Sequence, residues 1–398
     1  MGSVIYMDYH ATTPVDPRVV DAMLPYFTEK FGNPASRQHR HGWVAEEAVA
    51  SARLNIASAL HAEPKEVYFT SGATESNNLA IKGLIDAMGL KDKHVITCAT
   101  EHKSVLDVFY RLAKQGIEVT ILSVDEFGMV DIADLRKAIK DNTALVSIMF
   151  ANNEVGTLHD IAAIGVVCKE RGVIFHTDAT QAVGKIPIDV QVMNIDMLSL
   201  SGHKFYAPKG IGVLYVRGKN PHVMIKPLVD GGGHERGLRS GTLNVPSIVG
   251  LAKALELCIE SMPEESKRLK HLRDNLFGGL TRKVDDVYLN GHPTHRLSNN
   301  LNVSFLGVED NALMMGMKDV AVASGSACSS AEPMPSHVLK ALRIGKARET
   351  SAIRFGLGRW TTAEEIEYVI GRVAETVKKL RSLTSHYRPK YTGVSPVS

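Results

Sequence analysis

Between residues 67 and 216 the chain alternates short apolar runs, typical of buried strands, with amphipathic stretches typical of helices. Two of the helical stretches cover residues 104–114 and 161–170. The strand-like runs are residues 67–70, 95–99, 119–124, 144–151, 173–178, 197–201 and 212–216. Such alternation predicts an α/β fold, in which a mainly parallel, seven-stranded sheet is covered by helices on both faces.

A polar cluster follows most of these strand-like runs. The clusters are residues 71–76, 101–102, 152–154, 178 and 203–204. Open parallel sheets bind ligands at the carboxyl ends of their strands, so we expect these clusters to meet at one crevice. In isolation, a histidine or a capped helix start is more often structural. The shared edge of the sheet favours a functional site.

Lys204 and Asp178 have the chemistry of a pyridoxal phosphate site. Residues 198–210 form an apolar strand that ends in a small polar turn, which places Lys204 beside a buried element. A partly buried lysine loses its proton more readily and then forms a Schiff base with an aldehyde. Asp178 ends another apolar run, and a carboxylate keeps the ring nitrogen of this cofactor protonated. Taken alone, the pair also fits a surface lysine and a capping aspartate.

Two glycine-containing segments are candidates for holding an anion. Residues 71–74 open a helix over residues 77–88, and such a helix start offers free backbone N–H groups to a phosphate. Residues 230–242 are rich in glycine, basic and hydroxyl side chains. That loop either closes over an anion or is only a mobile turn.

The order of elements changes at residues 262–263, where a helix predicted over residues 246–260 ends and a charged helix over residues 264–283 begins. The strands predicted beyond this point are residues 300–305, 320–324 and 352–357. We therefore expect two domains. The large domain is residues 15–262, and a smaller α+β domain is formed by residues 1–14 and 263–398.

Two residues of the smaller domain stand out. Cys328 lies among small polar residues, whereas Cys98 and Cys168 lie in apolar runs typical of buried structural thiols. An accessible thiol with a pKa near ~8.5 is a good nucleophile at neutral pH. Arg354 interrupts an apolar strand, and its guanidinium suits the carboxylate of an amino acid. The alternative for Arg354 is an edge-strand arginine that faces water.

Composition excludes several classes of protein. The 398 residues carry a net charge of +3 without a basic arm, so we expect no nucleic-acid partner and no anionic membrane surface. No apolar run approaches the ~18 residues of a membrane span, and the first residues do not resemble a secretory signal. A cytoplasmic protein is expected. Its four cysteines are far apart, which predicts neither a disulfide framework nor a zinc site.

The chain resembles the cysteine desulfurases of the housekeeping iron–sulfur cluster assembly type, within the class V aminotransferase branch of the fold-type I pyridoxal phosphate enzymes. The resemblance extends from residues 7–14 to the final helix. The motifs that carry it are, in order, SGATES, TEHKSV, NNEVGT, DATQ, SGHK, GGGHERGLRSGT and SGSACSS. It implies a homodimer with pyridoxal 5'-phosphate as cofactor, L-cysteine as substrate, and an iron–sulfur scaffold protein among several sulfur acceptors.

The resemblance also implies roles for the residues that match these motifs. Lys204 would be the Schiff-base lysine, and His102 would stack on the cofactor ring and shuttle protons. Asp178 would pair with the ring nitrogen, and Gln181 would hydrogen-bond the phenolic oxygen. The phosphate would be held by Ala73, Thr74, Ser201, His203 and, from the other subunit, Thr242.

Substrate and sulfur would be handled by three further residues. Asn153, beside the cofactor, and Arg354 would orient the amino acid. Cys328 would take its sulfur as a persulfide and leave L-alanine. No metal is expected other than a transient iron–sulfur cluster at Cys328. The segment 331–337 carries one proline more than the usual run of relatives.

Three other functions remain open from the sequence. Selenocysteine lyases share the same framework. A class V aminotransferase would use Lys204 and Asp178 but would leave Cys328 without a role. A sulfur carrier without catalysis would need no complete cofactor site.

Overall fold

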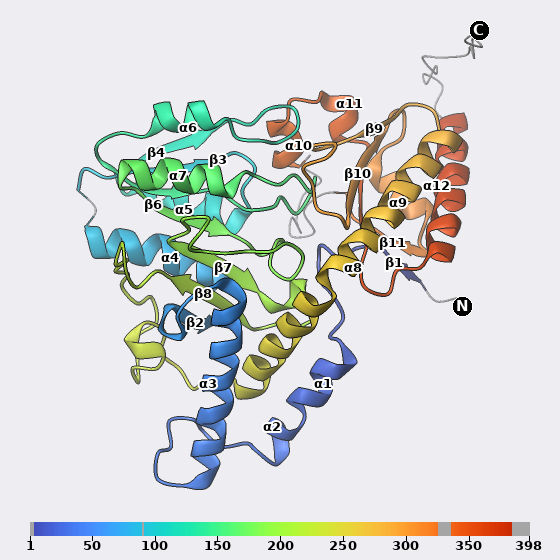
Figure 1. The fold of residues 1–398 in the computed structure, drawn as a ribbon. Helices are drawn as coiled ribbons and strands as arrows, with labels where there is room; N and C mark the ends of the chain where they lie inside the picture. Colours follow the sequence, from blue (N-terminus) through green and yellow to red (C-terminus); the bar gives the residue numbers. More distant parts are fainter. Residues whose placement is uncertain (1–3, 90, 325–335, 384–398) are drawn as a thin grey trace.

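The computed structural model describes residues 4–89, 91–324 and 336–383 (Figure 1). The largest sheet within these residues has seven strands in the order β2-β8-β7-β6-β5-β3-β4. The strands are β2 (Val67–Thr70), β3 (His94–Cys98), β4 (Glu118–Leu122), β5 (Thr143–Ser147), β6 (Ile174–Asp178), β7 (Met197–Ser201) and β8 (Gly212–Val216). Neighbours are parallel except at β8, which is antiparallel to β2 and β7. The predicted α/β fold with a mainly parallel seven-stranded sheet is confirmed.

Helices cover both faces of this sheet. They are α3 (Arg40–Leu60), α4 (Ala73–Met88), α5 (Lys103–Lys114), α6 (Ile132–Ala138), α7 (Ile161–Arg171) and the first part of α8 (Val245–Lys283). Successive strand residues enter opposite cores, because side chains alternate across a strand. Val95 and Leu145 pack in the core that includes α4 and α5, while Ile96 and Val146 pack in the core that includes α3 and α7. Burial on both faces explains why these strands are continuous apolar runs.

A smaller antiparallel sheet lies beside the large one. Its order is β12-β10-β9, and a parallel pair, β1 and β11, lies next to it. These elements are β1 (Ile5–Tyr6), β9 (Val287–Leu289), β10 (Asn300–Phe305), β11 (Val320–Ala321) and β12 (Ala352–Gly356). The nearby helices are α9 (Asp310–Gly316), α10 (His337–Ala341), α11 (Lys346–Glu349) and α12 (Ala363–Leu383). Leu301 and Phe355 share an apolar core with Val369 of α12 and with Met7, near the N-terminus.

Helix α8 corrects one prediction. It is a single helix of 39 residues with Pro263 inside it, not two helices separated at that proline. Proline removes one backbone hydrogen bond, which costs about 3 kcal/mol or more in an isolated helix. Here Leu251 and Leu255 are buried in the core of the large sheet, and Leu272 and Leu276 in the core of the smaller sheet. Packing of both halves therefore outweighs the break.

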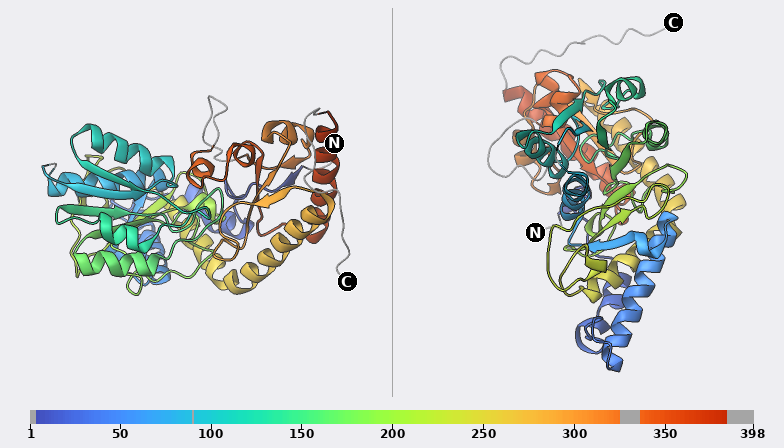
Figure 2. Two further views of the ribbon diagram at one scale, coloured as in Figure 1. Left: turned by 90° about the horizontal axis from the view of Figure 1, so that it is seen from above. Right: turned by 90° about the vertical axis from the view of Figure 1, so that its left-hand side faces the viewer.

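Figure 2 shows the two sheets with their helices side by side, joined along α8. We keep the division into residues 15–262 and residues 1–14 with 263–398 as a proposal. Two further helices, α1 (Pro17–Met23) and α2 (Pro25–Thr28), pack against α8. Over the described part of the chain, no helix combines the length and the apolar character that crossing a membrane requires.

Candidate active site

A cavity of about 480 Å³ lies at the carboxyl ends of the large sheet's strands. It contains almost all of the site residues that the sequence predicted, although they come from distant segments. Those that line it are Ala73, Thr74, His102, Asn153, Asp178, Gln181, Ser201, His203, Lys204 and Arg354. Thr242 does not line it and is exposed, and Cys328 lies outside the described residues.

Lys204 ends a short 3-10 turn that directly follows β7. Its Nζ donates hydrogen bonds to the backbone carbonyls of His10 and Ala11, at 2.7 Å each. Both carbonyls belong to the N-terminal segment, which lines the cavity and lies against the lysine. Two acceptors on one side orient the amine without neutralising its charge.

Asp178 ends β6 and is 5% exposed. Its Oδ2 accepts a hydrogen bond from Asn77 Nδ2 at 2.8 Å, and its Oδ1 accepts one from the Thr180 backbone N–H at 3.0 Å. These two donors fix the plane of the carboxylate. Asn77 is on α4, and the sequence reasoning missed it, although the helix start in the same segment was recognised.

His102 caps α5, and its ring nitrogen Nδ1 accepts the Ser104 backbone N–H at 3.1 Å. The neutral ring therefore carries its hydrogen on Nε2. Burial lowers the pKa of His102, so the neutral form predominates at neutral pH. Ser104 Oγ also lies 2.8 Å from Nδ1 and accepts from Asn77 Nδ2 at 2.9 Å. The Asn77 amide therefore contacts Asp178 directly and His102 through Ser104.

The start of α4 forms a small polar cradle, which we define as residues 72–74 together with Ser201 and His203. Gly72 precedes the helix with φ 150° and ψ 179°, a conformation open only to glycine. A Cβ on Gly72 would lie 3.5 Å from Ser201 Oγ. The first N–H groups of a helix have no helical partner and point at whatever lies beyond its end. Burial and the nearby Lys204 lower the pKa of His203 to about 4, so it is neutral.

Arg354 reaches the cavity from β12 of the smaller sheet and is 1% exposed. Its Nη2 forms an ion pair with Asp8 at 2.7 Å, and its Nη1 donates to the Asn153 carbonyl at 2.9 Å. The buried Nε has no hydrogen-bond partner among the described residues. The guanidinium is therefore a buried cation with donor capacity to spare, not an edge-strand arginine in water.

Both described flanks of residues 325–335 contact residues around the cavity. Ala323 exchanges two backbone hydrogen bonds with Arg354, at 2.7 and 3.3 Å. On the other flank, Ser336 Oγ donates to Glu154, and His337 Nε2 lies 2.9 Å from the Glu101 carbonyl. The described residues on either side of this segment therefore lie beside the cavity.

The three described cysteines are buried and unpaired with one another. Burial raises the pKa of the Cys98 and Cys168 thiols well above their usual value, and that of Cys258 to about 11. A thiol held in its protonated form is a poor nucleophile. The prediction that Cys98 and Cys168 are structural agrees with this burial.

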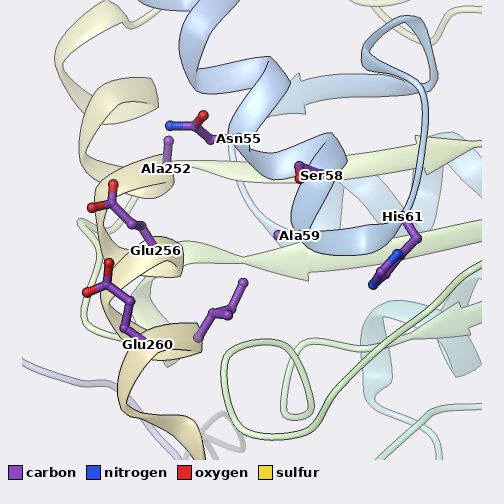
Figure 3. A pocket seen from close by; sticks show the side chains of 8 residues that line it. Asn55, Ser58, Ala59, His61, Ala252, Glu256 and Glu260 are labelled. Atoms are coloured by element: carbon purple, nitrogen blue, oxygen red, sulfur yellow. The ribbon is translucent and has the colours of Figure 1, made fainter.

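A second hollow, of about 440 Å³, lies between α3 and α8 (Figure 3). Glu256 and Glu260 of α8 are among its lining residues, and His61 lies at the end of α3. None of the site residues predicted from the sequence lines this hollow. Glu256 is already paired with Lys253, so this surface offers no comparable convergence of groups.

Comparisons with known proteins identify the family of this chain. The family model described as aminotransferase class-V matches residues 5–369. A cysteine desulfurase IscS from Anaeromyxobacter dehalogenans (strain 2CP-C) is 53% identical over 390 residues, covering 98% of this chain and 96% of that protein. A solved NifS-like protein superposes with a TM-score of 0.88 at 36% identity, covering 94% of this chain and 100% of that one.

A solved structure of SspA in complex with cysteine has a TM-score of 0.79 at 40% identity, and the match covers 90% of this chain and 100% of that one. The membership that these comparisons establish implies a pyridoxal phosphate cofactor. The chain belongs to the class V aminotransferase family and, within it, to the cysteine desulfurases.

Proposed function

We propose that this protein removes the sulfur of L-cysteine with the help of pyridoxal phosphate, releases L-alanine and holds the sulfur as a persulfide on Cys328. The observation that carries the proposal is the single cavity shared by Lys204, Asp178, His102 and Arg354. An amine, a carboxylate, an imidazole and a guanidinium around one space match an aldehyde-bearing ring and an amino-acid substrate. When bound, the cofactor supplies an electron sink for the substrate's α-carbon.

The residues present fit pyridoxal phosphate at each of its polar groups. The cradle offers helix N–H groups and hydroxyls to the phosphate, Lys204 offers its amine to the aldehyde, and Asp178 offers a carboxylate to the ring nitrogen. Thr180 Oγ1, on the lining of the cavity, is a buried atom without a partner among the described residues. An additional polar ligand in the cavity would satisfy it.

Lys204 and His102 are the residues we propose for proton transfer. Lys204 Nζ is oriented by two carbonyls, and it is positioned to take the α-proton of the substrate and to return a proton later. His102 is neutral at neutral pH, with its hydrogen on Nε2, because the Ser104 N–H occupies Nδ1. A neutral imidazole stacks on an aromatic ring without the cost of burying a charge.

Arg354 and Asn153 are the residues we propose for the substrate carboxylate. The guanidinium is held by Asp8 on one side and by the Asn153 carbonyl on the other. Such a preoriented fork binds a carboxylate with little loss of side-chain entropy. Because Arg354 is on β12 of the smaller sheet and Asn153 is in the segment that follows β5 of the large sheet, the substrate would lie between the two sheets.

Cys328 is the residue we propose for sulfur transfer. Its thiolate attacks the sulfur of the substrate, and a sulfur–sulfur bond forms as the carbon–sulfur bond breaks. The electron pair of the broken bond stays on the former β-carbon, which takes a proton and becomes the methyl group of alanine. No external oxidant or reductant is needed. The persulfide then passes to acceptors, among them an iron–sulfur scaffold protein, or transiently supports a cluster.

We also propose a homodimer in which Thr242 reaches the partner's cradle. Thr242 is exposed and does not line its own cavity. Helices α1 to α3 project from the body of the molecule (Figure 1) and carry an exposed apolar surface. Its members are Leu24, Phe27, Phe31, Trp43 and Leu54, each more than half exposed. Apolar area of this kind favours burial in an interface. The cytoplasmic location remains a prediction.

One experiment tests the function. The holoprotein is incubated with L-cysteine, alanine and sulfide are quantified with and without a thiol reductant, and the persulfide is located by mass spectrometry. We expect alanine and sulfur in equimolar amounts, and we expect mass spectrometry to find the additional sulfur atom on Cys328. The Cys328→Ser variant should keep the cofactor absorbance and lose sulfide release. Sulfide release by that variant would contradict the role of Cys328.

The same preparation separates the alternative functions. Amino transfer to an added 2-oxo acid, without sulfide release, would support an aminotransferase. A strong preference for selenocysteine over cysteine would support a lyase. Protein without bound cofactor would support a sulfur carrier.

A further inference from the structure

Two side chains that the mechanism above does not use, His10 and Lys185, both contact the amide oxygen of Gln181. His10 Nδ1 lies 3.0 Å from Gln181 Oε1. Lys185 Nζ donates to the same oxygen at 3.3 Å and to the Gln181 backbone carbonyl at 3.1 Å. Gln181 Nε2 donates to the His10 carbonyl at 3.1 Å. The side-chain amide of Gln181 therefore makes three of these contacts, two through its oxygen and one through its nitrogen.

These contacts determine which end of the amide is oxygen. The His10 carbonyl only accepts hydrogen bonds, and the Lys185 ammonium only donates them. Reversing the Gln181 amide would place N–H groups against Lys185 and an oxygen against the carbonyl. In the observed orientation, Nε2 uses one hydrogen on His10 and keeps the second for a ligand in the cavity that Gln181 lines.

His10 is itself held in place by the smaller sheet. It is 1% exposed, and burial lowers its pKa well below the usual value, so the neutral ring carries a single hydrogen. Gln181 Oε1 can only accept, which assigns that hydrogen to Nδ1, and Nε2 lies 3.3 Å from the Asn299 carbonyl. Strand β12 passes so close that a Cβ on Gly356 would lie 2.9 Å from the His10 ring. The His10 carbonyl also accepts from Lys204 Nζ at 2.7 Å. A displacement of His10 would therefore disturb both Gln181 and Lys204.

Lys185 lines a small hollow together with Cys258 and Glu265 of helix α8. Lys204 is close enough to influence the pKa of Lys185. Burial, with the nearby Lys204, lowers the pKa of Lys185 to about 7. Both the ammonium and the amine carry N–H donors, so the hydrogen bond to Gln181 persists on either side of that pH.

We propose that Lys185 and His10 are positioning residues, which hold the Gln181 amide with an N–H free for an anionic oxygen of the bound cofactor. The inference rests on the proposed function, because the orientation of Gln181 matters only when pyridoxal phosphate occupies the cavity. The oxygen concerned is the phenolic one. A donor on that oxygen stabilises its ionised form and makes it easier to remove the proton shared with the lysine nitrogen.

The test is an absorbance titration of the holoprotein and its Lys185→Met variant, which measures the pH midpoint of the bound cofactor. We expect the midpoint to rise by about 0.5 to 1 unit, because a misoriented amide loses part of a charge-assisted hydrogen bond. Lys169→Met is the matched control. Lys169 is an exposed lysine that also donates to an amide oxygen, that of Asn194, and it does not line the cavity. Its midpoint should equal that of the wild type.

A double-mutant cycle separates positioning from a direct effect of the Lys185 charge. In a Gln181→Ala background, Lys185→Met should no longer change the midpoint. An equal shift in that background, or no shift in the single variant, overturns the inference. If Lys185→Met does not fold, His10→Leu removes the other donor and should raise the midpoint too. Wild-type protein that binds no cofactor or releases no sulfide contradicts the proposed function instead.

Discussion

Replacing Gly72 by alanine tests whether the start of α4 holds the cofactor phosphate. Gly72 has φ 150° and ψ 179° and lines the cavity. Its matched control is Gly89, which ends the same helix with φ 82° and ψ 152° and has nothing within 4 Å of a built Cβ. Both glycines have backbone conformations that alanine adopts only with strain. Only Gly72 lies at the cradle.

The expected magnitudes follow from this difference. Strain at a conformation reserved for glycine costs about 1–3 kcal/mol, so both variants should lose stability by a similar amount. At Gly72, we expect relief of the strain to turn the first N–H groups of α4 away from the position proposed for the phosphate. Loss of one charge-assisted hydrogen bond costs about 1.5–3 kcal/mol, which corresponds to a rise of about 10- to 150-fold in the cofactor's Kd.

The assay titrates the apo forms of the two variants and of the wild type with pyridoxal phosphate. Absorbance or quenching of intrinsic fluorescence monitors binding and gives the cofactor's Kd. Urea unfolding of the same samples measures stability. We expect Gly72→Ala to lose both affinity and stability, and Gly89→Ala to lose stability alone. Equal Kd values for both variants and the wild type would show that the phosphate does not bind at the start of α4.

Three further predictions concern other parts of the molecule. Arg354→Gln should raise the KM for L-cysteine about 10- to 100-fold while the cofactor absorbance is retained, because a charged contact to the carboxylate is lost; an unchanged KM in steady-state kinetics would exclude that contact. Burial raises the pKa of Glu101 from its usual 4.5 to about 8, so the folded protein keeps a proton there that the unfolded chain releases. Between these pH values, the free energy of unfolding of the wild type should therefore fall relative to that of Glu101→Gln as pH rises. Urea-unfolding free energies that change equally with pH in the two proteins would refute this. Glu235→Gln should cost about 3 kcal/mol in urea unfolding, because Glu235 accepts from Arg53 at 2.6 and 2.9 Å and from the Phe69 N–H at 2.7 Å; a loss below ~1 kcal/mol would count against a buried pair.

Much of the site could be predicted because its chemistry follows strand ends. Asp178 and Lys204 each end a buried run, and parallel strands place such positions at one edge whatever the loops do between them. Arg354 was recognisable as a charge inside an apolar strand. The residues that hold these groups in place were not recognised. Asn77 and Ser104 are ordinary polar helix residues in the sequence, and their contact forms only when α4 and α5 pack together.

The sequence alone determined which segments become strands and helices and which side chains stand at strand ends, because alternation and amphipathicity are local patterns read over a few residues. Only the tertiary structure decided that α8 continues through Pro263, since leucines on both sides of the proline are buried in different cores. It also decided that the His10 carbonyl meets Lys204 and that Lys185 meets the Gln181 amide. Contacts such as that of His10 with Lys204, 194 positions apart, depend on how whole sheets bury their faces, which no local pattern contains.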